Sequence, residues 1–407
     1  MTSRSTLTDL HLALRRSEVQ DFDSAWTMPA NFYTDPAILA LEREHLFGQE
    51  WICIGRAEEI ARPGDYITFQ LCDEPLIATR DAEGKVHVLS NVCRHRGTVL
   101  VNESGNAPLL ICPYHHWSYD LKGKLKAAPR LEAHTSFDRS ACRLPEFPCE
   151  EWQGFLFTSL AEDPKPLAAR LAPLTTRLHN YHMEKMSLKY LATEVWNTNW
   201  KCFVENFMEG YHLSPLHRTT LHAVNPTQLC TRFEAGDAYF GYNAGYSPDL
   251  ARSNKGHPAL AAAEADNCVM FAIPPALVSG CGGDYSSFIC VQPESVDRVR
   301  AKMGLIFHGD GWAQTDIDRA VQLFIATMAE DKAVQVSLMK GMASARHQRG
   351  PLAPADFEGP VLDFYRYCSR RLGDAIAAQS PASALTCAVA QIAERPRSDS
   401  VIHDAPL

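Results

Sequence analysis

The sequence has no long hydrophobic run. No stretch approaches the roughly 18 consecutive apolar residues that a membrane-spanning helix needs. The first twenty residues, MTSRSTLTDLHLALRRSEVQ, also lack the apolar core of a secretory signal peptide. We therefore expect no membrane partner and a cytoplasmic location.

Positive charge is scarce as well. The chain has 39 Lys and Arg residues against 48 Asp and Glu residues, and its formal net charge is −9. This balance does not favour binding to nucleic acid, so we expect no nucleic-acid partner. Thirteen cysteines scattered over 407 residues do not resemble the dense framework of a small disulfide-stabilised domain, and we interpret them as metal ligands and buried thiols.

A dinucleotide fingerprint is absent. The stretch SGCGGDY, at 279–285, has neither the GxGxxG spacing nor a helix pattern after it. We therefore expect any nicotinamide or flavin chemistry to belong to another protein.

The texture of the chain changes along its length. From about residue 50 to 160, short β-type runs such as GDYITFQL and KVHVLSNVC alternate with turns. Longer helical patterns mixed with strands follow, which predicts an α+β protein. We divide the chain into an N-terminal helical segment packing on the larger domain (1–45), a small antiparallel β domain (46–165), a mixed domain (166–378) and a frayed tail (379–407).

The β domain contains a distinctive set of cysteines and histidines. Cys93 and His95 form Cys-x-His, and after 16 intervening residues Cys112 and His115 form Cys-x-x-His. Two thiolates and two imidazoles suit either a structural zinc or a [2Fe-2S] cluster in which two histidines replace two cysteines. Each half contributes one cysteine and one histidine instead of a Cys-x-x-Cys knuckle, which favours the cluster.

A second motif lies about a hundred residues later, in NTNWKCFVENFMEGYHLSPLH (197–217). The spacing of Glu205, Glu209 and His212 predicts one face of a helix. Pro215 should end that helix, so that His217 can turn back toward His212. Two imidazoles and one carboxylate form the facial triad of non-haem iron(II) oxygenases.

Together these motifs resemble a known family. CRHRG and CPYHHW resemble a Rieske domain, and NWKxxxENxxExYHxxxxH after them is similar to the large (alpha) subunit of Rieske non-haem iron oxygenases. The resemblance implies a β-sandwich Rieske domain and a catalytic domain with a curved antiparallel sheet wrapped by helices. It also implies that Cys93 and Cys112 hold one cluster iron and that His95 and His115 hold the other.

The resemblance further implies the mononuclear iron site. It places Asp331 beside His212 and His217 as the third Fe(II) ligand, with three rival carboxylates: Glu330, Asp316 and Asp318. Asn206 and Glu209 are carried over as catalytic residues. In the family, the residue at Glu209 links the iron of one subunit to a cluster histidine, here His115, of its neighbour in a homotrimer.

The resemblance also bears on the reaction. Most ring hydroxylases have aspartate at the bridge position, whereas the branch acting on betaines and carnitine has glutamate, as in Glu209. We therefore favour O2-dependent N-demethylation of a small quaternary ammonium compound such as a betaine. Electrons would come from a separate ferredoxin or flavin reductase that uses NAD(P)H. The alternatives are hydroxylation or dihydroxylation of an aromatic ring or aromatic acid, and a Rieske protein that only carries electrons.

Aromatic side chains are frequent around and after the second motif. They could form a cage for a quaternary ammonium or a slot for an aromatic ring. The favoured pocket residues are Phe203, Phe207, Tyr211, Tyr239, Phe271 and Phe288, and the further candidates are Phe233, Phe240, Tyr242, Tyr246 and Tyr285.

Overall fold

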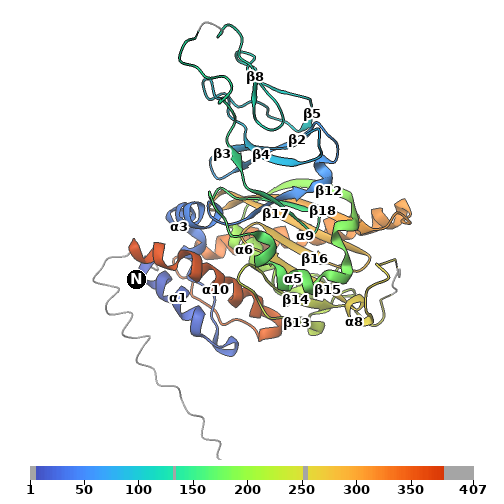
Figure 1. Cartoon of the computed structure of the whole chain (residues 1–407). Helices are drawn as coiled ribbons and strands as arrows, with labels where there is room; N and C mark the ends of the chain where they lie inside the picture. Colours follow the sequence, from blue (N-terminus) through green and yellow to red (C-terminus); the bar gives the residue numbers. More distant parts are fainter. Residues whose placement is uncertain (1–5, 132–133, 251–254, 380–407) are drawn as a thin grey trace, which may run out of the picture.

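The computed structural model describes residues 6–131, 134–250 and 255–379, which form a small upper lobe and a larger lower lobe (Figure 1). The predicted tail lies, from residue 380 on, outside the described residues. Helices and antiparallel sheets are both present, and the predicted α+β class is confirmed. Within the described residues, no helix is both long and apolar enough to cross a lipid bilayer.

The upper lobe consists of short antiparallel strands. One sheet has the order β5-β2-β3-β4-β9, and a second, smaller sheet has the order β6-β7-β8. A third sheet, β1-β11-β10, lies where the chain enters and leaves this lobe. The strands are β1 (Ile52–Arg56), β2 (Asp65–Leu71), β3 (Glu74–Arg80), β4 (Val86–Ser90), β5 (Gly105–Asn106), β6 (Leu110–Ile111), β7 (Ser118–Tyr119), β8 (Leu125–Ala127), β9 (Glu146–Phe147), β10 (Cys149–Trp152) and β11 (Phe155–Thr158).

The lower lobe is built on one antiparallel sheet with the order β12-β18-β17-β16-β15-β14-β13. Its long strands β12 and β18 pair over almost their full length. The strands are β12 (Met186–Trp196), β13 (Cys230–Arg232), β14 (Phe240–Gly245), β15 (Asn267–Ile273), β16 (Leu277–Cys281), β17 (Tyr285–Ser295) and β18 (Arg298–His308).

Helices pack around this sheet (Figure 1). They are α1 (Leu7–Val19), α2 (Asn31–Thr34), α3 (Pro36–Glu42), α4 (Leu167–Arg170), α5 (Ala172–Arg177), α6 (Trp200–Phe207), α7 (Leu213–Leu216), α8 (Ala262–Ala265), α9 (Gln314–Met342) and α10 (Ala355–Ala378). The N-terminal helix α1 packs against α10, near the other end of the chain.

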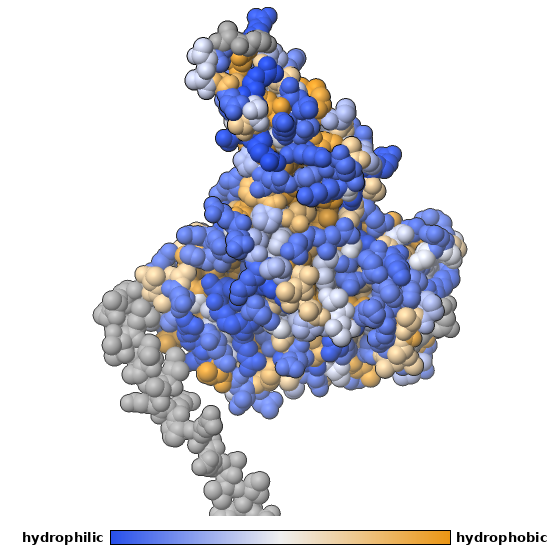
Figure 2. Space-filling view, in the orientation of Figure 1, coloured by the Kyte–Doolittle hydropathy of each residue, from blue (hydrophilic) through white to orange (hydrophobic). Residues whose placement is uncertain are grey.

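The two lobes share a hydrophobic core. Leu76 and Val88 from the upper lobe belong to the same buried cluster as Trp196 and Val299 from the lower lobe. On the face drawn in Figure 2, hydrophobic residues gather at the narrow junction, while most of the remaining surface is hydrophilic. Apolar burial of this kind stabilises the position of one lobe against the other.

A buried ion pair fixes the helix that leads to the second motif. Lys201 and Glu42, which are 1% and 0% exposed, form a salt bridge between α6 and α3. The indole Nε1 of Trp200 donates a hydrogen bond of 2.7 Å to the same carboxylate. Because a buried charge needs a partner, Trp200 and Lys201 of the NWK sequence set the orientation of α6.

Candidate functional site

The second motif is not one continuous helix. α6 ends at Phe207, and the break comes at Met208–Gly210, before Pro215, which lies inside the short helix α7. At Gly210 a Cβ atom would collide with Cys230 Sγ, and its amide donates to the carbonyl oxygen of Phe357. The predicted helix end at Pro215 is therefore wrong.

Glu205 and Glu209 accordingly point to different places. Glu205 accepts hydrogen bonds from the hydroxyls of Tyr33, at 2.8 Å, and Tyr365, at 3.3 Å. Glu209 lies in the turn after α6, where its carboxylate accepts hydrogen bonds from the amides of Tyr211 and His212. The expectation that both glutamates share a helix face with His212 is also wrong, because the chain leaves the helix between them.

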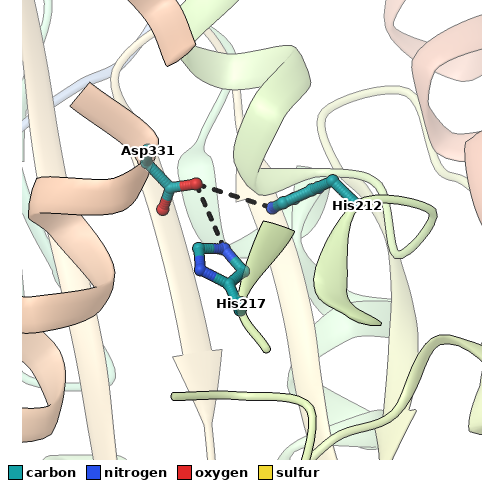
Figure 3. A group of neighbouring side chains, drawn as sticks. All are labelled: His212, His217 and Asp331. Atoms are coloured by element: carbon teal, nitrogen blue, oxygen red, sulfur yellow. Dashed lines mark ion pairs between the residues drawn. The ribbon is translucent and has the colours of Figure 1, made fainter. Parts of the chain in front are cut away.

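Three side chains from two distant segments, the ends of α7 and the middle of α9, converge on one point (Figure 3). Asp331 Oδ1 on α9 lies 3.2 Å from His217 Nε2 and 3.6 Å from His212 Nε2. One potential ligand atom from each residue lies within 4.8 Å of the other two. The structure thus brings together the two histidines and the favoured carboxylate of the predicted triad.

Carboxylates behind the imidazoles fix their orientation. Glu209 contacts Nδ1 of His212, and Glu330 contacts Nδ1 of His217 at 2.7 Å. When Nδ1 carries the proton for such a contact, Nε2 presents its lone pair toward Asp331. This is the usual arrangement of histidines that bind metals, each holding its second nitrogen on a carboxylate.

The atoms that face one another are not satisfied by the protein. His217 Nε2 and Asp331 Oδ1 are buried and have no hydrogen-bond partner, although their residues are 0% and 1% exposed. Burial tends to lower the pKa of His212, but the carboxylates of Glu209 and Asp331 raise it overall. A divalent cation would satisfy these atoms and match the negative potential, so the residues fit a mononuclear iron.

The rival carboxylates are not part of the triad. Glu330 stands behind His217 and accepts a hydrogen bond of 2.6 Å from the hydroxyl of Thr220. Asp316 pairs with Lys255 and Arg319 on the outer part of α9, and the exposed Asp318 accepts from Gln314. None of these three carboxylates belongs to the cluster of potential ligand atoms around His212.

The first motif forms two matching turns in the upper lobe. In each turn the amide four residues after the cysteine donates to that cysteine's carbonyl, from Gly97 to Cys93 and from His116 to Cys112. Both donors have a left-handed backbone, with φ of 75° at Gly97 and 58° at His116. The side chain of His116 is exposed, and its backbone closes this turn.

The four side chains of the first motif are arranged for a shared centre. Cys93 and Cys112 are buried, at 3% and 1% exposure. His95 and His115 are nearer the surface, and their Nδ1 atoms lie 3.2 Å apart. The hydroxyl of Tyr119 lies 3.4 Å from Cys93 Sγ and accepts from the amide of Arg94 at 3.0 Å, so it donates to the sulfur. Paired inner thiols and outer imidazoles fit a [2Fe-2S] cluster with two histidine ligands.

A cavity of about 150 Å3 opens beside the triad. Its walls are mostly apolar, and among its described lining residues there is no lysine or arginine. The aromatic members of the lining are Phe207, Tyr242, Tyr246, Tyr285 and Phe324. A larger hollow of about 710 Å3 adjoins this cavity and shares with it Val224, Tyr246, Tyr285, Ala320 and Leu323.

Of the six favoured pocket aromatics, only Phe207 lines this cavity. Phe203 packs in the core against Trp196, and Tyr211 is 54% exposed and stacks on Phe357. Tyr239 borders a different hollow.

Phe271 and Phe288 lie on the opposite face of the sheet. They pack against Trp152 and Phe155. Since side chains alternate along a strand, their neighbours Met270 and Ile289 line the cavity instead. The selection of these two phenylalanines as pocket residues is therefore wrong, because both faces of the sheet are apolar and sequence periodicity does not say which one faces the triad.

Comparisons with known proteins agree with these two sites. Residues 50–148 match the Rieske [2Fe-2S] domain, and residues 175–374 match the ring hydroxylating alpha subunit (catalytic domain). The first match removes the structural-zinc alternative, and the second removes the alternative of a protein that only carries electrons.

Similar proteins have been named. The carnitine monooxygenase oxygenase subunit of Acinetobacter baumannii is 29% identical over 336 residues, which are 81% of this chain and 88% of that protein. The glycine betaine monooxygenase oxygenase subunit of Pseudomonas aeruginosa (strain PAO1) is 27% identical over 387 residues, covering 86% of this chain and 90% of the relative.

Solved structures share the fold. The quaternary ammonium Rieske monooxygenase CntA in complex with L-carnitine has a TM-score of 0.74 at 23% identity, covering 86% of this chain and 97% of that one. Naphthalene 1,2-dioxygenase from Rhodococcus sp. bound to indole also has a TM-score of 0.74, at 20% identity, over 94% of this chain and 100% of that one.

The two domain matches therefore bear out the sequence resemblance. Members of this family carry a Rieske [2Fe-2S] cluster and a mononuclear iron, act on small molecules and receive electrons from a separate protein. The chain belongs to the Rieske non-haem iron oxygenases, as an oxygenase (alpha) subunit of the ring-hydroxylating family.

Proposed function

We propose that this chain oxidises an N-methyl group of a small quaternary ammonium compound, such as a betaine, with O2 and two electrons. Hydroxylation of the methyl carbon uses one oxygen atom of O2, and the other leaves as water with two protons. The resulting N-hydroxymethyl product breaks its C–N bond and releases formaldehyde, a proton and a tertiary amine. The electrons come from NAD(P)H through a separate flavin or ferredoxin reductase, and a cytoplasmic location suits that supply.

The cavity beside the triad is the observation that carries this proposal. Five aromatic residues line it, and the carboxylates of Asp331, Glu209 and Glu330 surround the two histidines. A permanent cation gains from aromatic faces and from nearby negative charge without needing a counter-ion of its own. An aromatic acid is a net anion without a cationic group of its own, and the described lining residues include neither lysine nor arginine to offset its charge beside these carboxylates.

The size of the cavity agrees with a small substrate. A dry cavity of about 150 Å3 holds a molecule the size of benzene, and the cavity here has about that volume. A trimethylammonium group with a short substituent has a similar size. The names of the relatives, carnitine and glycine betaine monooxygenase subunits, support the same substrate class.

We assign the two iron centres to the residues already described. Cys93, Cys112, His95 and His115 hold the cluster, and His212, His217 and Asp331 hold the mononuclear iron. Iron(II) at such a triad supplies open coordination positions for dioxygen. Within the chain, Glu209 and Glu330 keep the imidazoles oriented, while the apolar walls of the cavity exclude water. Asn206 lines the cavity and its buried Nδ2 has no partner, which supports its assignment as a catalytic residue.

We further propose a head-to-tail homotrimer in which Glu209 contacts His115 of the partner subunit. Exposed apolar side chains lie near both ends of such a contact. Ile111 and Tyr114, near His115, are 53% and 56% exposed, and Tyr211, two residues after Glu209, is 54% exposed. Burial of these side chains would favour association and bring the two iron centres within reach of each other.

A reconstituted turnover assay tests the proposed function. Purified oxygenase, a compatible reductase and NADH are incubated with glycine betaine, carnitine, choline and a set of aromatic acids. We expect one formaldehyde for each NADH consumed with at least one of the quaternary ammonium compounds. Hydroxylated ring products without formaldehyde would contradict N-demethylation and favour the aromatic alternative, because an apolar cavity of this size also accepts a benzene ring.

A further inference from the structure

Two buried polar atoms in the cavity wall have no partner and are not assigned to the metal. They are Asn206 Nδ2 and Thr327 Oγ1. Three other polar residues of the wall use their donors within the protein. Asn225 donates to the carbonyl of Ala244, Tyr242 to that of Glu209, and Ser279 to that of Ser287.

Thr327 is well placed to meet a substrate. It lies on α9 one helical turn before Asp331, so the two side chains project from the same face of the helix. Thr327 is 5% exposed and Asp331 is 1% exposed, and both line the cavity. A group bound beside the triad therefore passes close to the hydroxyl.

The hydroxyl also lacks the bond that a helix normally offers it. A threonine inside a helix often donates to the carbonyl four residues earlier, which here belongs to Leu323. Thr327 Oγ1 makes no such hydrogen bond. A buried hydroxyl without a partner lowers stability, and the deficit disappears when a ligand supplies an acceptor.

We propose that Thr327 donates a hydrogen bond to an oxygen atom of the substrate. This inference rests on the proposed function. The quaternary ammonium group lies among the aromatic rings, and the second polar group, a hydroxyl or a carboxylate, is held by Thr327. The wall beside the triad has neither lysine nor arginine among its described residues, whereas Lys255 and Arg319 line the adjoining hollow. At the triad, a neutral donor such as Thr327 therefore recognises this oxygen.

The variant Thr327→Val tests the inference, since valine keeps the shape of threonine and removes the hydroxyl. The probes are propyltrimethylammonium, which has no oxygen, choline and glycine betaine. Dissociation constants are measured by anaerobic calorimetry on the iron-loaded enzyme, and KM and kcat are measured from formaldehyde release. The matched controls are Thr327→Ser, which keeps a hydroxyl at this position, and Thr176→Val, which removes an exposed hydroxyl from α5.

We expect Thr327→Val to weaken binding of choline roughly three- to tenfold. For glycine betaine, whose acceptor is charged, the loss should be roughly tenfold or more. Binding of propyltrimethylammonium should change less than about twofold, and Thr327→Ser should behave like the wild type. A loss confined to one of the two oxygen-bearing probes also supports the inference and identifies which oxygen is bound.

Two results would overturn the inference in distinguishable ways. In the first result, the wild type turns over the probes, and Thr327→Val weakens the binding of all three equally or of none. Thr327 then does not bind the substrate oxygen, and the proposed function stands. If the wild type neither binds nor oxidises any of these three compounds or carnitine, the proposed function fails and the inference fails with it.

Discussion

Replacement of Glu209 by glutamine should slow turnover roughly ten- to hundredfold without removing either iron centre. One carboxylate oxygen of Glu209 contacts His212 Nδ1, and the other accepts from the amides of Tyr211 and His212. Glutamine has one acceptor oxygen, so its NH2 group must face a donor on one of these two sides. The variant therefore loses at least one charge-assisted hydrogen bond.

The size of the effect follows from that loss. A hydrogen bond to a charged group contributes about 1.5–3 kcal/mol, and each 1.4 kcal/mol in a barrier is about tenfold in rate. The metal-facing Nε2 of His212 is untouched, so the ligand set remains. If Glu209 carries the link to the cluster of the partner subunit, reoxidation of the reduced cluster by O2 in the presence of substrate should slow by the same factor.

Stopped-flow spectroscopy of the reduced enzyme measures that reoxidation, and iron analysis measures both centres. Glu184→Gln is the matched control, because Glu184 contacts His182 Nδ1 at 3.0 Å outside the catalytic site, and it should react like the wild type. Loss of the mononuclear iron together with activity would make Glu209 a ligand. Unchanged reoxidation in Glu209→Gln would refute its role as the bridge.

Three further changes test other parts of the structure. Cys112→Ser should abolish the visible absorption and the reduced-state paramagnetic resonance of the cluster while leaving the mononuclear iron; an unaltered spectrum would exclude Cys112 as a ligand. Lys201→Met should lower the free energy of unfolding by about 3–5 kcal/mol, because Glu42 is then buried without a cation. Most of the lost stability should return in the double variant with Glu42→Gln, and chemical denaturation measures the stability of both variants. Burial raises the pKa of Glu205 from 4.5 to about 8, so the folded protein holds a proton that the unfolded chain releases in this interval, and stability should fall as pH rises from about 4.5 to 8. Glu205→Gln should flatten this slope in thermal scans, and an identical slope would show that Glu205 does not cause it.

The metal motifs could be found from the sequence because their chemistry restricts both residue type and spacing. Cysteines and histidines at the spacing of Cys93–His115 are typical of few sites other than metal centres. For the second motif, Figure 3 shows His212 and His217 pointing toward Asp331. The position of Asp331 came from the family resemblance, since nothing in the local pattern of α9 distinguishes it from Glu330. Only the folded chain separates the carboxylate that faces both Nε2 atoms from the one behind His217.

The cavity wall was largely beyond sequence reasoning. Both faces of the lower sheet are buried, so an apolar pattern cannot say that Ile289 faces the triad and Phe288 faces away. In the break after α6, Gly210 packs closely against Cys230, a residue twenty positions later, and no local pattern records that contact. The roles of Tyr119 and Thr327 likewise depend on which neighbours are present or absent, which no local pattern records.

Iron analysis of Asp331→Ala, set beside the wild type, tests the central claim most directly. The wild type should contain about three irons and two acid-labile sulfides per chain. The variant should contain about two irons, with the absorption and paramagnetic resonance of the reduced cluster unchanged and without formaldehyde release. A variant that kept three irons, or that lost the cluster signals along with the third iron, would contradict the assignment of Asp331, His212 and His217 to a separate mononuclear site.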